Sequence, residues 1–163
     1  MLRQKKSLYA SSDGERGLYL AYTVAGFFGA LLSFMVVNQL VGADEIIRPL
    51  GLYDYWSIFS GAVGAASGLY IGRRWLGDPG ISGWIKAVIA VPVISFIGSL
   101  VGGTLALPLY GTMFGPMALA ITFYENPIIL VLWIWTILVS HILFAGHRRE
   151  RDSIFQELTP SET

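Results

Sequence analysis

Basic residues are spread unevenly around four apolar runs of this chain, and this bias constrains the fold more than any other feature. Arg48 alone lies beside one set of run ends, whereas the other ten of the eleven Lys and Arg residues lie beside the opposite set. Short loops rich in Lys and Arg stay cytoplasmic, because moving them across a bilayer is unfavourable. The ten residues are Arg3, Lys5, Lys6, Arg16, Arg73, Arg74, Lys86, Arg148, Arg149 and Arg151.

The composition agrees with lipid as the main surroundings. Of the 163 residues 54% are hydrophobic and only 13% are charged, with a mean hydropathy of +0.59. An ordinary soluble domain carries about 25% charged residues. The formal net charge is zero, which gives no indication of a nucleic-acid partner. The chain has no cysteine, which excludes disulfides, thiol catalysis and Cys-ligated metals.

The four apolar runs predict four transmembrane helices in one integral membrane domain. A crossing needs about 20 apolar residues, and the first run, with no charge over residues 18–41, is too long for the h-region of a secretory signal. With the basic residues inside, both termini are cytoplasmic, and four crossings satisfy this. We therefore expect an all-α protein of the bacterial inner (plasma) membrane. The expected spans are residues 18–41, 55–72, 85–107 and 127–145, followed by a cytoplasmic tail over 146–163.

A further apolar segment, residues 108–124, does not fit a simple crossing. It is uncharged, but a fifth crossing would move the C-terminal arginines outside, against the charge rule. Pro108, Gly111, Gly115 and Pro116 interrupt its first half. We expect a connection on the outer side that lies in the interface, or that dips into the membrane and returns.

Small residues recur at intervals of four in three of the predicted spans. This spacing places them on one stripe of a helix, where they allow the backbones of neighbouring helices to approach closely. The pattern predicts a compact bundle of the first three spans. The helix-packing residues are Ala25, Gly29 and Ser33 in the first span, Gly64, Gly68 and Gly72 in the second, and Ser95, Ser99 and Gly103 in the third.

The fourth span has no small-residue stripe and carries Trp133 and Trp135. We expect it to present bulky side chains outward, either to lipid or to a partner membrane protein. His141 lies near its inner end, where it is either a hydrogen-bonding residue or a contact to another subunit. His141 and His147 occupy different faces of this helix, so they do not form a pair of ligands for one metal or haem.

No Asp, Glu, Lys or Arg lies in the middle of any predicted span, which argues against a self-contained ion-coupled transporter. No nucleotide-binding, hydrolase or zinc-protease motif is present. We therefore expect no catalytic residue, metal site or cofactor, and membrane lipid and other membrane subunits as partners. The leading hypothesis is a non-enzymatic accessory or assembly subunit of a larger membrane complex. The alternative is an oligomeric channel or passive transporter for a small solute.

Overall fold

Every regular element of the described chain is a helix, as the sequence predicts. The computed structural model describes residues 12–41 and 49–158, so Arg3, Lys5, Lys6 and Arg48 lie outside the described residues. The helices are α1 (Asp13–Val41), α2 (Leu52–Gly72), the short 3-10 helix η1 (Arg73–Trp75), α3 (Gly80–Ala106), α4 (Gly111–Glu125) and α5 (Pro127–Leu158).

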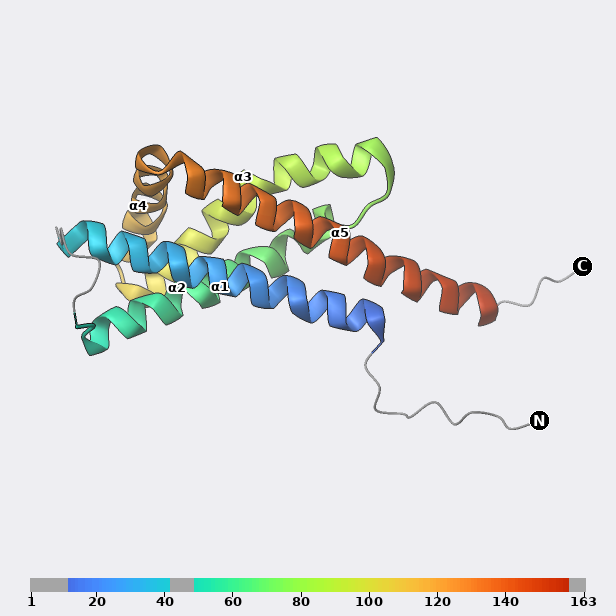
Figure 1. The fold of residues 1–163 in the computed structure, drawn as a ribbon, viewed down its shortest axis with the longest axis horizontal. Coiled ribbons are helices and arrows are strands. Elements are labelled where there is room, and N and C mark those ends of the chain that lie inside the picture. The colour runs from blue at the N-terminus through green and yellow to red at the C-terminus, as the bar shows by residue number, and fades with distance from the viewer. Residues whose placement is uncertain (1–11, 42–48, 159–163) are drawn as a thin grey trace, which may run out of the picture.

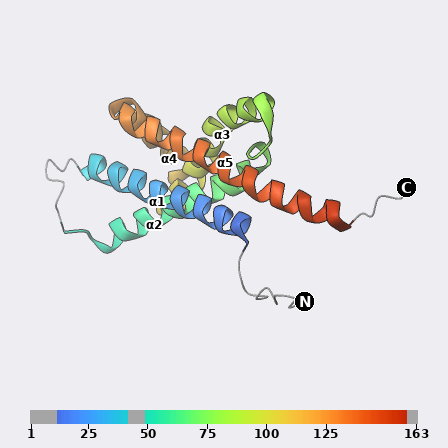
Figure 2. The same ribbon diagram turned by 45° about the vertical axis from the view of Figure 1, so that its right-hand side comes forward.

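Four long helices, α1, α2, α3 and α5, run back and forth along the molecule (Figures 1 and 2). The backbone N–H of Gly14, at the start of α1, donates to Glu150 Oε2 of α5 at 2.6 Å. Both ends of the described chain therefore lie at one end of the bundle, which we call the tail end. The opposite end, where α1 and α3 finish, holds α4 and is called the α4 end (Figure 1).

Three helices, rather than the predicted four, are long and apolar enough to cross a membrane. They are α1, α3 and α5, whose most apolar windows have mean hydropathies of 2.0, 2.1 and 2.5. The remaining predicted span, residues 55–72, is helical in α2 but does not reach this apolarity. The physical reason is its content of Gly, Ala and Ser, which pack against neighbouring helices. Its buried residues are Asp54, Ser57, Ser60, Gly64, Ala65, Gly68, Leu69 and Gly72.

The interrupted segment over residues 108–124 contains the 15-residue helix α4. A helix of this length extends about 22 Å, which is less than the hydrocarbon thickness of about 30 Å. Figure 1 shows α4 steeply inclined to the long helices, across the end where α5 begins. Leu109, in the turn before α4, has a positive φ of 76°, which lets the chain reverse sharply after α3.

Helix α5 does not stop at the predicted inner boundary near residue 145. It continues to Leu158, so most of the predicted tail is a straight extension of the last span. Arg and Glu are good helix formers, and the sequence HRRERD after Gly146 therefore prolongs the helix while adding charge. Helix α5 therefore continues beyond the end of its apolar stretch.

Candidate functional site

Close contacts between small residues join α1 to α2. Gly29 of α1 lies against the backbone of Gly61 and the side chain of Ala65 in α2. The Ser33 hydroxyl donates to the Ser57 carbonyl oxygen at 2.6 Å. Ala25, in the same predicted stripe, is fully buried. The stripe of the first span therefore faces α2 and the interior.

The stripe of the second span lies against α3. Gly64 approaches the backbones of Gly98 and Gly102, and Gly68 approaches the Ile94 carbonyl. Gly72 lies against the Ile94 side chain. At Gly64 and Gly68 a Cβ would meet backbone atoms, so glycine is required for the helices to lie this close.

The stripe of the third span contacts α5 and α4. The Ser95 hydroxyl accepts a hydrogen bond from Trp133 of α5, while Ser99 and Gly103 lie against Gly115 of α4. The neighbouring row of Gly98 and Gly102 makes the contact with α2 instead. Helix α3 therefore packs through two adjacent small-residue rows, and the row of Ser99 and Gly103 holds α4, which the predicted three-helix bundle left out.

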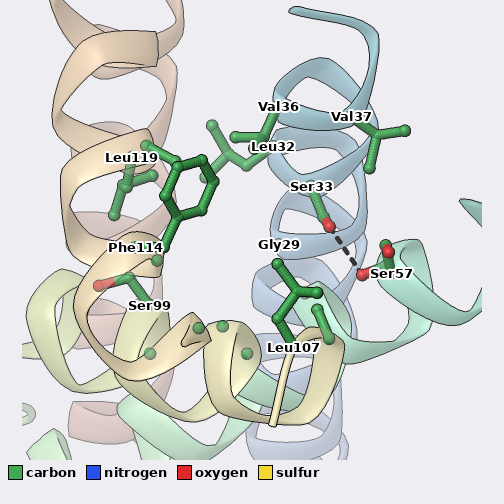
Figure 3. A pocket seen from close by; sticks show the side chains of 18 of the residues that line it. Gly29, Leu32, Ser33, Val36, Val37, Ser57, Ser99, Leu107, Phe114 and Leu119 are labelled. Carbon is green, nitrogen blue, oxygen red and sulfur yellow. Dashed lines mark hydrogen bonds between the residues drawn. The ribbon is translucent and has the colours of Figure 1, made fainter. Parts of the chain in front are cut away.

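An apolar groove lies between α1 and α4, with α2 and α3 beneath it (Figure 3). Its volume is about 200 Å³. Leu32 and Val36 line it on α1, and Phe114 and Leu119 line it on α4. The floor consists mainly of small residues, which are Gly29, Gly61, Ala65, Gly98, Ser99, Gly102, Gly103 and Gly115.

A polar contact joins the two walls of this groove. The Gln39 side-chain amide of α1 donates to Glu125 Oε2 at 2.8 Å, and its carbonyl oxygen accepts from the Thr122 hydroxyl at 2.9 Å. Thr122 is fully buried, and its single hydroxyl proton is shared with the Ala118 carbonyl oxygen, which is also 2.9 Å away. Gln39 therefore holds α4 against α1 beside an otherwise apolar groove.

Three serine hydroxyls in or beside the groove donate to backbone carbonyls of their own helices. Ser60 donates to the Trp56 carbonyl, Ser95 to the Val91 carbonyl and Ser99 to the Phe96 carbonyl. These bonds satisfy the donors with backbone acceptors of the same helix. They leave a groove surface made mostly of carbon.

The two tryptophans of α5 have opposite environments. Trp133 is 2% exposed, and its Nε1–H donates to Ser95 Oγ at 2.7 Å. The expectation that it faces outward is therefore wrong, because an indole N–H finds its partner inside the bundle. Trp135, at 62% exposed, does face outward.

His141 is also inside the protein, at 3% exposed. Its Nδ1 accepts a hydrogen bond from the Gly77 N–H at 3.0 Å, and its ring lies 5.0 Å from that of Trp84. Gly77 has a φ of 85° and packs against the α5 backbone at Phe144. His141 thus holds the connection between η1 and α3 on α5.

Charged groups fasten the same connection at the tail end. Asp78 bonds Lys86 at 2.7 Å and also pairs with Arg148. Arg148 donates in addition to the Arg73 carbonyl at 3.1 Å. The hydrogen bond from Lys86 holds the pKa of the Asp78 carboxyl below its ordinary value; burial opposes this shift, and the charges of Lys86 and Arg148 assist it.

Among residues 12–41 and 49–158, no three His, Asp or Glu side chains gather as a metal site would require. No family model matches the chain, and neither a curated protein nor a solved structure matches it. The roles of the groove and of the charged groups at the tail end are therefore inferred from the chemistry of their residues.

Proposed function

We propose that this chain is a non-enzymatic membrane subunit that associates with another membrane protein through the groove between α1 and α4. The observation that carries the proposal is the combination of an apolar groove with a floor of glycines. Glycine floors allow close approach, which drives association where lipid offers no hydrophobic gain. The partner protein would carry out the main activity, and this chain would assist the assembly or the stability of that partner.

The size of the groove favours an inserted side chain over a whole helix. The groove is small, at about 200 Å³, and is walled on both sides by α1 and α4. A helix of the partner would therefore lie across the opening and insert one or two bulky apolar side chains. The proposed occupant is the apolar face of a transmembrane helix in another protein.

The hydrogen bonds around the groove favour this function over a channel within one chain. A solute path needs polar atoms that can exchange partners with the solute. The hydroxyls of Ser33, Ser95 and Ser99, which line the groove, instead donate to backbone carbonyls within the bundle. An association surface requires no such exchange.

We also propose that the chain lies in a bacterial inner membrane with both termini cytoplasmic. In this arrangement α2 crosses as well, shielded from lipid along its buried face by α1 and α3. Its 21 residues extend about 31 Å, enough for one crossing. The basic residues of the tail end then remain on the cytoplasmic side.

Filling the groove tests the proposed association. Ala118 is buried at the groove wall, whereas Met117, the preceding residue of α4, is 54% exposed and does not line it. Tagged wild type, Ala118→Phe and Met117→Phe are purified from native membranes in mild detergent, and co-purifying proteins are quantified. We expect one membrane protein to be retained by wild type and Met117→Phe, and reduced at least about tenfold by Ala118→Phe, because a misfit of about 1.4 kcal/mol suffices.

Val36→Phe fills the groove from α1 and serves as an independent second variant. Loss of the partner in both filled variants, with thermal stability near that of wild type, supports the proposal. Isolation of the wild type as a lone chain with only lipid bound contradicts it. Equal loss of the partner in Met117→Phe contradicts the assignment to the groove.

A further inference from the structure

An exposed apolar stripe runs along α4. Tyr110, Met113, Met117, Ile121 and Tyr124 follow one another at intervals of three or four residues, which places them on one side of the helix. Met113 is 86% exposed and Tyr124 is 87% exposed. The stripe carries no charged residue. What surrounds it depends on how deep α4 lies relative to the long helices.

Contacts with α3 fix this depth. Gly111 of α4 packs against Gly103, and Gly115 packs against Ser99. Ser99 precedes Ala106, the last residue of α3, by seven positions, which is about 10 Å of helix. The middle of α4 therefore lies beside α3, well inside the end of that helix rather than beyond it.

This part of α3 lies in the apolar layer when the helix crosses a membrane. Lys86 is the last charged residue of α3, and the 20 residues from 87 to 106 follow it. They extend about 30 Å, which equals the hydrocarbon thickness. With Trp84 and Lys86 at the headgroups of the tail end, Ser99 lies within the hydrocarbon. Acyl chains rather than water therefore surround α4 at the level of Ser99.

Hydrogen bonds at the start of α4 suit such surroundings. The Thr112 side chain is exposed, but its hydroxyl shares a hydrogen bond with the Thr104 hydroxyl of α3 at 2.9 Å. In the turn before α4, the Gly111 N–H donates to the Leu107 carbonyl at 2.7 Å, and the Leu107 N–H donates to the Gly103 carbonyl at 2.8 Å. Water would supply partners to a helix on the membrane surface, whereas hydrocarbon requires partners within the protein.

We propose that α4 lies within the lipid leaflet at the α4 end, with Met113 and Met117 of the exposed stripe against acyl chains. Tyr110 and Tyr124 then lie at the two ends of the stripe, where their hydroxyls reach the headgroups. Glu125, the last residue of α4, returns to the headgroup level, because it bonds Gln39 near the end of α1. The inference rests on the proposed membrane position but not on the proposed partner, since no residue of the stripe lines the groove.

Fluorescence quenching in single-cysteine variants of the full chain tests this position, because the chain has no cysteine. Met117→Cys, Phe96→Cys and Ser153→Cys are labelled with an NBD fluorophore and reconstituted in phosphatidylcholine vesicles. Phe96 is 56% exposed on α3 and serves as the reference for hydrocarbon, and Ser153, at the tail end, is the reference for water. The quenchers are phosphatidylcholine with a nitroxide on its acyl chain, and iodide present on both sides of the membrane.

We expect the acyl-chain nitroxide to quench the probes at Met117→Cys and Phe96→Cys at least about threefold more than iodide does, and the reverse for Ser153→Cys. Met113→Cys, on the same stripe, is a second variant that should behave like Met117→Cys.

If iodide mainly quenches Met117→Cys while Phe96→Cys responds to the nitroxide, α4 lies on the membrane surface and this inference alone is overturned. Protection of Met117→Cys from both quenchers would show that protein covers the stripe, and would overturn it as well. Quenching of Phe96→Cys mainly by iodide would contradict the membrane position itself.

Discussion

At the scale of single residues, one hydrogen bond ties α5 to α3. Trp133 donates to Ser95 at 2.7 Å while almost fully buried. Trp133→Phe removes the donor and should destabilise the protein by about 0.5–1.5 kcal/mol, with some further loss from the smaller ring. Thermal unfolding in detergent measures this effect.

Trp135→Phe is the control, because it makes the same substitution at an exposed position two residues away. A double-mutant cycle of Trp133→Phe with Ser95→Ala should give a coupling energy of about 1 kcal/mol. Additive effects of these two substitutions, or an equal loss in Trp135→Phe, would be inconsistent with the contact.

The Asp78 carboxylate predicts how the stability of the protein depends on pH. Because the folded-state pKa of Asp78 is lowered, its contribution to stability is present above the unfolded pKa of about 3.9 and is lost as the pH falls through the lower folded value. Asp78→Asn should therefore lower the Tm by about 2–4 °C at pH 7, as a loss of about 1 kcal/mol would. The difference from wild type should shrink below about pH 4.

Asp152→Asn is the control for this measurement, because the Asp152 side chain is 67% exposed and only loosely paired with Arg151. It should leave the Tm unchanged across the same range. A constant difference between wild type and Asp78→Asn from pH 7 to pH 3 would show that the Asp78 carboxylate does not act through its charge.

The environment of Trp133 shows how single residues could be placed from sequence. Between Pro127 and Ala145 the polar side chains of α5 are Thr136, Ser140 and His141, and all three are buried on the same side as Trp133. Their shared face is the signal that could have placed Trp133 inside the bundle. The glycines were easier, since their spacing of four has few other uses in an apolar helix. The spacing of the small residues did not, however, indicate that Ser99 and Gly103 face α4.

At the scale of elements, the α2–α3 contact depends on glycine. A Cβ on Gly64 would collide with the Gly98 carbonyl oxygen and approach the Gly102 backbone. Gly64→Ala should therefore push the helices apart and destabilise the fold by about 1–3 kcal/mol, despite the better helix propensity of Ala. Chemical or thermal unfolding in detergent checks this prediction.

Gly146→Ala on α5 is the matched control, because a Cβ there meets nothing within 4 Å. This substitution should be neutral or stabilising by up to about 1 kcal/mol. If both alanine variants behave alike, close packing of α2 on α3 is not what Gly64 provides.

The extent of each helix could be predicted only in part. The sequence indicates the start of α5 at Pro127, because Asn126 is a favourable N-cap and Pro127 a favourable first helical residue. Every predicted span is helical. The predicted span over 127–145 marks only the apolar part of α5, and the helix continues to Leu158 because Arg and Glu also favour helix. Helix α2 is not apolar enough to count as a membrane span by its hydropathy. Its packing residues are small, and small residues contribute little hydropathy.

At the scale of the whole molecule, the bundle brings its two ends together. The contact between Gly14 and Glu150 sets the start of α1 beside α5 at the tail end, and Tyr110, the residue directly before α4, is 80% exposed at the α4 end. If the long helices follow the membrane normal, the two ends of the bundle face opposite aqueous phases. The chain has no cysteine, so single cysteines can report this without background.

Labelling of Ser153→Cys, Ser12→Cys and Tyr110→Cys with a membrane-impermeant maleimide, in right-side-out and inverted vesicles, tests the central claim most directly. We predict that Ser12→Cys and Ser153→Cys react only in inverted vesicles and Tyr110→Cys only in right-side-out ones. Labelling of Ser12→Cys and Ser153→Cys from opposite faces would contradict the account, as would recovery of the protein in the supernatant after high-speed centrifugation.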